Sequence, residues 1–158
     1  MKSIVYIKGD ATAPVGDGHK VIVHVCNDFG KWGKGFVLAI SKRWKEPEKV
    51  YKAAYASDSN PPGLGDVQFV KAEDGITIAN MIGQHGIKKS NSKAEAPIRY
   101  PAIKQGLETI TKYALEHNSS IHMPRIGCGL AGGKWEEVEP LIEASLIAAG
   151  VSITVYDY

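Results

Sequence analysis

Short apolar runs rich in β-branched residues alternate along this chain with longer stretches of helical periodicity. This alternation constrains the fold most, because strands joined through helices build a mostly parallel sheet covered by helices. We expect strands at 4–8, 21–26, 67–71, 76–82, 120–123 and 151–156. We expect helices at 34–44, 47–57, 100–116 and 135–149. The sequence therefore predicts an α/β fold, with a three-layer α/β/α arrangement.

The last helix has the clearest pattern. One stripe at helical spacing is formed by Val138, Leu141, Ile142, Ser145, Leu146 and Ala149. We expect Pro140 to lie close to the first turn of this helix, where its missing N–H costs least. Gly150 is a stop signal before the final strand.

Length and composition are those of an ordinary globular protein. The 158 residues, 44% hydrophobic and 23% charged, suffice for one domain with a real core. We therefore expect residues 1–158 to form a single domain. No stretch approaches the ~20 apolar residues of a membrane span, and the N-terminus shows no signal-peptide pattern. We expect no membrane association and a cytoplasmic location.

The charge balance narrows the choice of ligands. A formal net charge of +2, from 19 Lys and Arg against 17 Asp and Glu, is too small to indicate binding to long nucleic acid. A small anion remains compatible, because backbone dipoles can hold one without net charge. The two cysteines, Cys26 and Cys128, have no metal-ligand spacing and form no disulfide framework. We expect no bound metal.

Two glycine-rich loops stand where α/β folds bind ligands, beyond the carboxyl ends of strands. They are "HVCNDFGKWGKGF" at 24–36 and "RIGCGLAGG" at 125–133. Each leads into a predicted helix, whose free N–H groups and dipole favour an anion. Tight turns alone would explain either loop, but together they favour a phosphate-bearing ligand such as a diphosphate. Neither loop matches a P-loop, and the GxGxxG run at 127–132 lies too near the chain's end for a dinucleotide fingerprint.

Five segments in collinear order, covering residues 3–158, resemble the macrodomain family. They are "IKGDAT", "HVCNDFGKWGKGF", "NMIG", "MPRIGCGL…W" and "ITVYDY". The similarity is to small single-domain macrodomains, which include ADP-ribose-1″-phosphate phosphatases and the terminal ADP-ribose protein glycohydrolase. It implies a central six-stranded mixed sheet with ADP-ribose, or a derivative, in a cleft across its crest. It implies no cofactor, and an ADP-ribosylated protein as a further partner.

The resemblance also implies roles for individual residues. Asp10 would accept a hydrogen bond from the adenine amino group, and Asn27 would contact the distal ribose. The remaining predicted ligand-binding residues are Gly33, Lys34, Gly35 and Phe36 in one wall, Gly127, Cys128, Gly129, Leu130 and Ala131 in the facing loop, and Tyr156 and Tyr158 around the adenine. The alternatives are a turn role for Asp10 and Asn27, and core or rim packing for the tyrosines. For Cys128, packing is favoured over nucleophilic catalysis.

Two positions depart from the glycohydrolase pattern. Gln84 and Ala131 stand where that enzyme has a lysine and an aspartate. Glutamine forms no covalent amine adduct, and alanine has no acid–base capacity. Lysine-dependent removal of ADP-ribose from acidic side chains is therefore not expected, although Lys88 and Lys89 follow nearby.

The phosphatase pattern is better preserved, in "HVCN" at 24–27 and "GKWGKG" at 30–35. His24 matches a proposed catalytic histidine, and its imidazole could orient a water or protonate the leaving ribose oxygen. The alternative is a satisfied, half-buried strand histidine, and His85 is a second candidate. We expect metal-independent hydrolysis of ADP-ribose 1″-phosphate, with His24 and Asn27 near the scissile group and positioning as the main effect. The alternatives are a non-catalytic ADP-ribose-binding module and a hydrolase of another derivative such as O-acetyl-ADP-ribose.

Overall fold

The computed structural model describes residues 2–57, 59–87, 96–129 and 131–158. Its centre is a six-stranded sheet in the order β1-β6-β5-β2-β4-β3. The strands are β1 Val5–Lys8, β2 Lys20–Asn27, β3 Val67–Glu73, β4 Ile76–Gln84, β5 Ser120–Met123 and β6 Ile153–Asp157. β3 runs antiparallel to β4, and every other neighbouring pair is parallel. The predicted mixed six-stranded sheet is confirmed.

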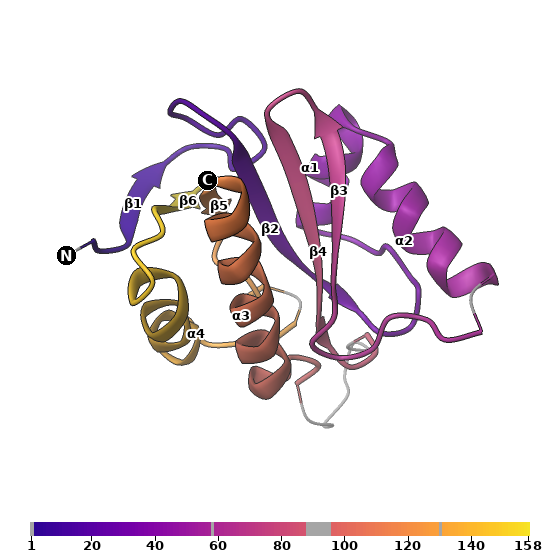
Figure 1. The fold of residues 1–158 in the computed structure, drawn as a ribbon. Helices are drawn as coiled ribbons and strands as arrows, with labels where there is room; N and C mark the ends of the chain where they lie inside the picture. The colour runs from indigo at the N-terminus through magenta and orange to yellow at the C-terminus, as the bar shows by residue number, and fades with distance from the viewer. Residues whose placement is uncertain (1, 58, 88–95, 130) are drawn as a thin grey trace.

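Helices cover both faces of this sheet (Figure 1). They are α1 Phe36–Arg43, α2 Glu46–Ser57, α3 Tyr100–His117 and α4 Trp135–Ile142, the last continuing into the π-helical turn η1 Glu143–Ile147. Helices α1 and α2 pack on one face, and α3 and α4 pack on the other, each over its own hydrophobic cluster. The three-layer α/β/α arrangement is therefore confirmed.

Strand β2 shows how the sequence divides the two layers. Ile22 and Cys26 belong to the cluster beneath α1 and α2, whereas Val21 and Val23 belong to the cluster beneath α3. This follows from the period of two in a strand, which sends successive side chains to opposite faces. Both β2 and β4 run one or two residues further than predicted, to Asn27 and Gln84. Their polar ends therefore reach the carboxyl edge of the sheet.

The expected place of Pro140 was wrong. The helix begins at Trp135, so Pro140 lies inside α4 and beyond its first turn. The residue is exposed, and the carbonyl that its missing N–H leaves without a helical partner can turn to water. Glu143 N–H then bonds to the carbonyls of both Glu139 and Pro140, where the π-helical turn starts. Within the described residues, no helix has the length and apolarity to cross a membrane.

Candidate functional site

Two adjoining cavities lie at the carboxyl edge of the sheet. The first, here called the loop cavity, measures about 270 Å³, and its lining includes Lys34, Gly35, Gln84, Gly127, Gly129 and Ala131. The second, the tyrosine cavity, measures about 540 Å³, and its lining includes Asp10, Thr12, Arg43, Tyr156 and Tyr158. Phe36 and Pro124 line both cavities. The two cavities adjoin at these residues and are together called the cleft.

Two glycines with positive φ shape the walls of the loop cavity. Gly35 has φ 84° and directly precedes α1, so the first free N–H groups of this helix lie at the cavity. Gly127 has φ 73°, and a Cβ there would lie 2.5 Å from Cδ1 of Ile98. The loop is closed by a 2.7 Å hydrogen bond from Gly133 N–H to the carbonyl of Gly127. A side chain would therefore clash at Gly127, and the positive φ of Gly35 disfavours one there, so both walls expose backbone.

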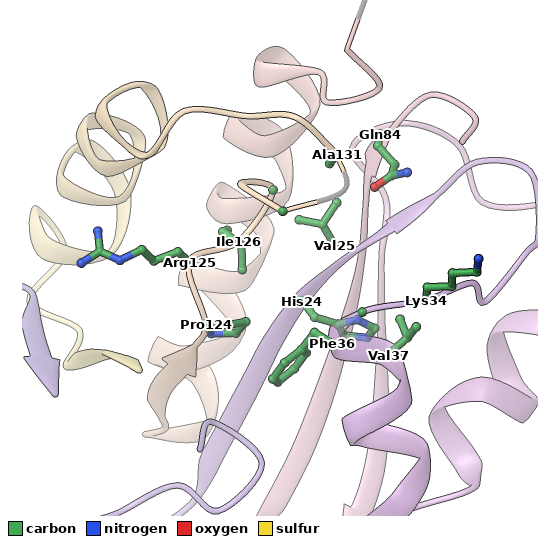
Figure 2. A pocket seen from close by; sticks show the side chains of 13 residues that line it. His24, Val25, Lys34, Phe36, Val37, Gln84, Pro124, Arg125, Ile126 and Ala131 are labelled. Carbon is green, nitrogen blue, oxygen red and sulfur yellow. The ribbon is translucent and has the colours of Figure 1, made fainter. Parts of the chain in front are cut away.

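Most of the predicted wall residues lie at the cavity. Lys34, Gly35 and Phe36 line it from one side, and Gly127, Gly129 and Ala131 from the other (Figure 2). Gly33 and Cys128 belong to the same loops without lining the cavity, and Leu130 lies outside the described residues.

Cys128 is a packed thiol. Its sulfur lies 3.4 Å from the carbonyl oxygen of Ile126. Burial raises the pKa of the Cys128 thiol, and the positive charge of Arg125 offsets this only in part. Because the thiolate is the nucleophilic form, this environment favours the packing alternative.

Asp10 lines the tyrosine cavity and also builds a turn. Its Oδ1 accepts hydrogen bonds from the backbone N–H of Thr12 at 2.8 Å and from the Thr12 hydroxyl at 2.7 Å. The Thr12 hydroxyl lowers the pKa of the Asp10 carboxyl, so the group is ionised at neutral pH. Among the described residues the structure gives Oδ2 no partner, which leaves an acceptor for a ligand.

Tyr156 lines the same cavity, and hydrogen bonds to its hydroxyl fix its ring. Its hydroxyl accepts a hydrogen bond from Val15 N–H at 3.0 Å and donates to Nδ1 of His122 at 2.7 Å. His122 Nε2 in turn donates to the hydroxyl of Ser120 at 2.8 Å. Tyr156 is therefore a buried wall with a fixed ring, whereas Tyr158 is fully exposed at the rim.

Asn27 is buried and its amide organises the loop that follows β2. Its Oδ1 accepts from the N–H groups of Phe29 at 2.9 Å and Lys31 at 3.3 Å, and its Nδ2 donates to the Lys31 carbonyl at 2.5 Å. The Tyr51 hydroxyl lies 2.8 Å from the same Oδ1. Asn27 does not line either cavity of the cleft, so its geometry favours the turn role.

His24 is 2% exposed and lies under Phe36 and Trp32. Its Nε2 lies 2.6 Å from Oδ1 of Asn80, and its Nδ1 lies 3.9 Å from the sulfur of Cys26. Burial lowers the pKa of His24 to about 4, so the imidazole is neutral at pH 7 and its Nε2–H donates to Asn80. Although His24 borders the loop cavity, this environment is that of a satisfied strand histidine.

His85, the second histidine candidate, lies beyond the cavity. Its Nδ1 lies 2.8 Å from Oδ2 of Asp28, and its ring packs edge-on against Phe29. Lys88 and Lys89 lie outside the described residues. Among the residues that the structure describes, no group of three or more His, Cys, Asp or Glu could hold a metal ion.

Sequence reasoning missed one support of the cleft, the side chain of Arg125. It points away from the loop cavity (Figure 2), pairs with both carboxylate oxygens of Asp157 at 2.7 and 3.1 Å, and lies over the rings of Tyr6 and Trp135. These partners come from β1, β6 and α4. Such a long-range cluster has no local sequence signal, although Arg125 itself stands in the quoted glycine loop.

Comparisons with known proteins agree with this geometry. The chain is 32% identical to the Chromodomain-helicase-DNA-binding protein 1-like of Mus musculus over 98% of its own length, but it spans only 18% of that protein. It is 28% identical to the ADP-ribose glycohydrolase OARD1 of Homo sapiens, covering 97% of this chain and 90% of the relative. It is 27% identical to the ADP-ribose 1″-phosphate phosphatase of Candida albicans, covering 89% and 92%.

A solved macrodomain protein from Streptomyces coelicolor is 50% identical and superimposes with a TM-score of 0.87, covering 99% of both chains. The family profile described as "Macro domain" matches residues 23–142, which include both glycine loops and the start of α4. From the fold, the cleft and these matches together, the chain belongs to the Macro domain family.

Proposed function

We propose that the cleft binds ADP-ribose, with the adenosine in the tyrosine cavity and the diphosphate between the two glycine loops. The observation that carries this proposal is that the two cavities adjoin at Phe36 and Pro124. One end of the cleft offers a carboxylate and an aromatic wall, and the other offers backbone N–H groups. ADP-ribose has the matching order of a base, a diphosphate and a second ribose.

The chemistry of the tyrosine cavity suits adenine. An ionised carboxylate only accepts hydrogen bonds, and the adenine amino group donates them. Tyr156 presents a rigid apolar ring on which a base can pack. Its hydroxyl is already hydrogen-bonded to Val15 and His122. Tyr156 therefore offers the base an apolar packing surface, and Asp10 offers the hydrogen bond to the adenine amino group.

The loop cavity suits a diphosphate. The glycine at the start of α1 lets backbone and helix dipole approach an anion closely, as at other phosphate-binding helix N-termini. Lys34 adds a positive charge to this wall. An ADP-ribosylated protein is a proposed partner of the same cleft, because its modification carries the same adenosine and diphosphate.

Calorimetric titration of the chain with ADP-ribose is expected to give one saturable site in the micromolar range. Asp10→Ala is expected to weaken binding about tenfold, because it removes one charge-assisted hydrogen bond. The matched control is Asp74→Ala, in the turn between β3 and β4, which should leave the affinity unchanged. Unchanged affinity in Asp10→Ala would remove this residue from the adenine role, and no saturation by the wild type would contradict the proposal.

The phosphatase relatives support a second candidate, hydrolysis of ADP-ribose 1″-phosphate. A proton donor works best with a pKa near the working pH, whereas burial holds the pKa of His24 at about 4. We infer that this reaction would depend on how the two glycine loops position the substrate. His24 would act as a structural residue that joins β2 to Asn80 of β4.

Phosphate release by the wild type and by His24→Gln tests this second candidate. Glutamine keeps a donor toward Asn80 but cannot act as an acid at neutral pH. We expect His24→Gln to retain most of whatever release the wild type shows. Complete loss of phosphate release in a folded His24→Gln protein would show that His24 is a catalytic residue. If the wild type releases no phosphate, ADP-ribose binding remains as the proposed function.

A further inference from the structure

Gln84, at the end of β4, is held with one side of its amide turned away from the cleft. Its Nε2 donates a 2.9 Å hydrogen bond to the carbonyl of Gly86. The Asp28 carboxylate accepts the N–H of Gly86 at 2.8 Å, which fixes the turn that holds this amide. One of the two N–H groups of Nε2 is held by the turn, and this fixes the amide with its oxygen Oε1 toward the loop cavity that Gln84 lines. Figure 2 shows this oxygen on the side of the cavity, above Val25.

A register shift puts Gln84 in this place. Asn27 of β2 pairs with Gln84, although the preceding pair is Cys26 with Ile82, so Gly83 is an extra residue in β4. Such a bulge re-aims the next side chain. A Cβ at Gly83 would lie 2.4 Å from Cδ1 of Ile103, so a side chain at this position would have to displace the buried Ile103.

Two described lining residues beside Oε1 are apolar. Ala131 and Val25 lie beside Gln84 at this end of the cavity (Figure 2). The imidazole of His24 is turned to Asn80 and Cys26. Among the described lining side chains, Gln84 is therefore the one that presents a hydrogen-bond acceptor to a ligand here.

The loop cavity has few described cationic side chains to balance the negative charge of a ligand. Two of its described lining residues are cationic, Lys34 and Arg125, but the guanidinium of Arg125 points away from the cavity (Figure 2) and pairs with Asp157. Among the described lining residues, Lys34 is therefore the cation left for the two negative charges of a diphosphate. A further phosphate on the distal ribose would add roughly one and a half to two negative charges. It would meet an amide oxygen, with the Asp28 carboxylate just behind the turn.

We propose that Gln84 is a specificity-determining residue that selects a free hydroxyl on the distal ribose over a phosphate at that position. This inference rests on the proposed binding of ADP-ribose and names its ligand class. The hydroxyl donates to Oε1, whereas a phosphate oxygen at the same point faces another acceptor, with no cationic side chain beside it among the residues that the structure describes. The resident ligand is accordingly ADP-ribose with an unphosphorylated terminal ribose, and its 1″-phosphate is the weaker ligand.

The test is calorimetric titration of the full chain with ADP, ADP-ribose and ADP-ribose 1″-phosphate. For the wild type we expect ADP-ribose to bind more tightly than ADP, and at least roughly tenfold more tightly than the 1″-phosphate, the effect of about one hydrogen bond. Gln84→Leu should lose the advantage of ADP-ribose over ADP while leaving ADP affinity unchanged. Gln84→Lys should reverse the preference toward the 1″-phosphate. The matched control is Gln105→Leu on α3, away from the cleft, which should change none of the three affinities.

Each remaining outcome overturns the inference in a recognisable way. A wild type that binds the 1″-phosphate as tightly as ADP-ribose shows that Gln84 does not select against it. Equal weakening of ADP and ADP-ribose in Gln84→Leu shows that the residue only shapes the cleft through the turn at Gly86. Failure of the wild type to bind any of the three ligands overturns the proposed function as well.

Discussion

Gly127→Val is expected to reduce ADP-ribose affinity at least about a hundredfold, roughly 3 kcal/mol of binding free energy. Gly127 has φ 73°, a conformation in which a β-branched residue is a severe outlier. Its Cβ would also lie 2.5 Å from Cδ1 of Ile98, which is buried against the same loop. The loop must shift, and the wall that we propose for the diphosphate shifts with it. Titration with ADP-ribose measures the loss.

Gly75→Val is the matched control for this prediction. Gly75 has φ 83° in the turn between β3 and β4, and a Cβ there meets nothing within 4 Å. Both variants should lose stability through backbone strain, on the order of 1–3 kcal/mol, but only Gly127→Val should lose affinity. Equal affinities in the two variants would mean that the loop is not a wall of the ligand site.

Acidification from pH 7 to pH 4 is expected to lower the free energy of unfolding by several kcal/mol. Burial lowers the pKa values of His24 and His122 to about 4, below the unfolded value of 6.5. Above pH 6.5 both histidines are neutral in either state, so the stability is fully present there. As the pH falls toward 4 the unfolded chain takes up protons first, at a cost of about 3 kcal/mol for each histidine.

Urea unfolding at a series of pH values measures this dependence. His24→Gln should remove about half of the slope between pH 6.5 and 4, because one of the two buried histidines is gone. A midpoint that stays constant from pH 7 to pH 4 in the wild type would contradict the buried, neutral state of these side chains.

The fold could be predicted because its signals are local. The period of two in β2 separates Ile22 and Cys26 from Val21 and Val23, and the structure has the same division. Glycine loops after strands similarly marked the carboxyl edge of the sheet, where Gly35 and Gly127 line a cavity. Pro140 was misplaced because the sequence does not show that this position is exposed. At an exposed position, the carbonyl that loses its helical partner can bond to water instead.

The support of the site could be predicted only in part, because it depends on contacts between distant residues. The role of Asn27 depends on closing a loop onto Lys31 and on the hydroxyl of Tyr51 from α2. The neutral state of His24 depends on burial and on Asn80 from the next strand. Tyr51 and Asn80 lie 24 and 56 residues from the side chains they contact, so no local spacing marks them. The sequence alone therefore left both a ligand contact and a structural contact open for Asn27 and His24.

The most direct measurement of the central claim is a crystal structure of this chain with ADP-ribose. The account predicts the adenine against Tyr156 with its amino group at Asp10, the diphosphate between the loops that contain Gly35 and Gly127, and the distal ribose at Gln84. Electron density for the ligand outside this cleft, or with adenine at the Gln84 end, would contradict it.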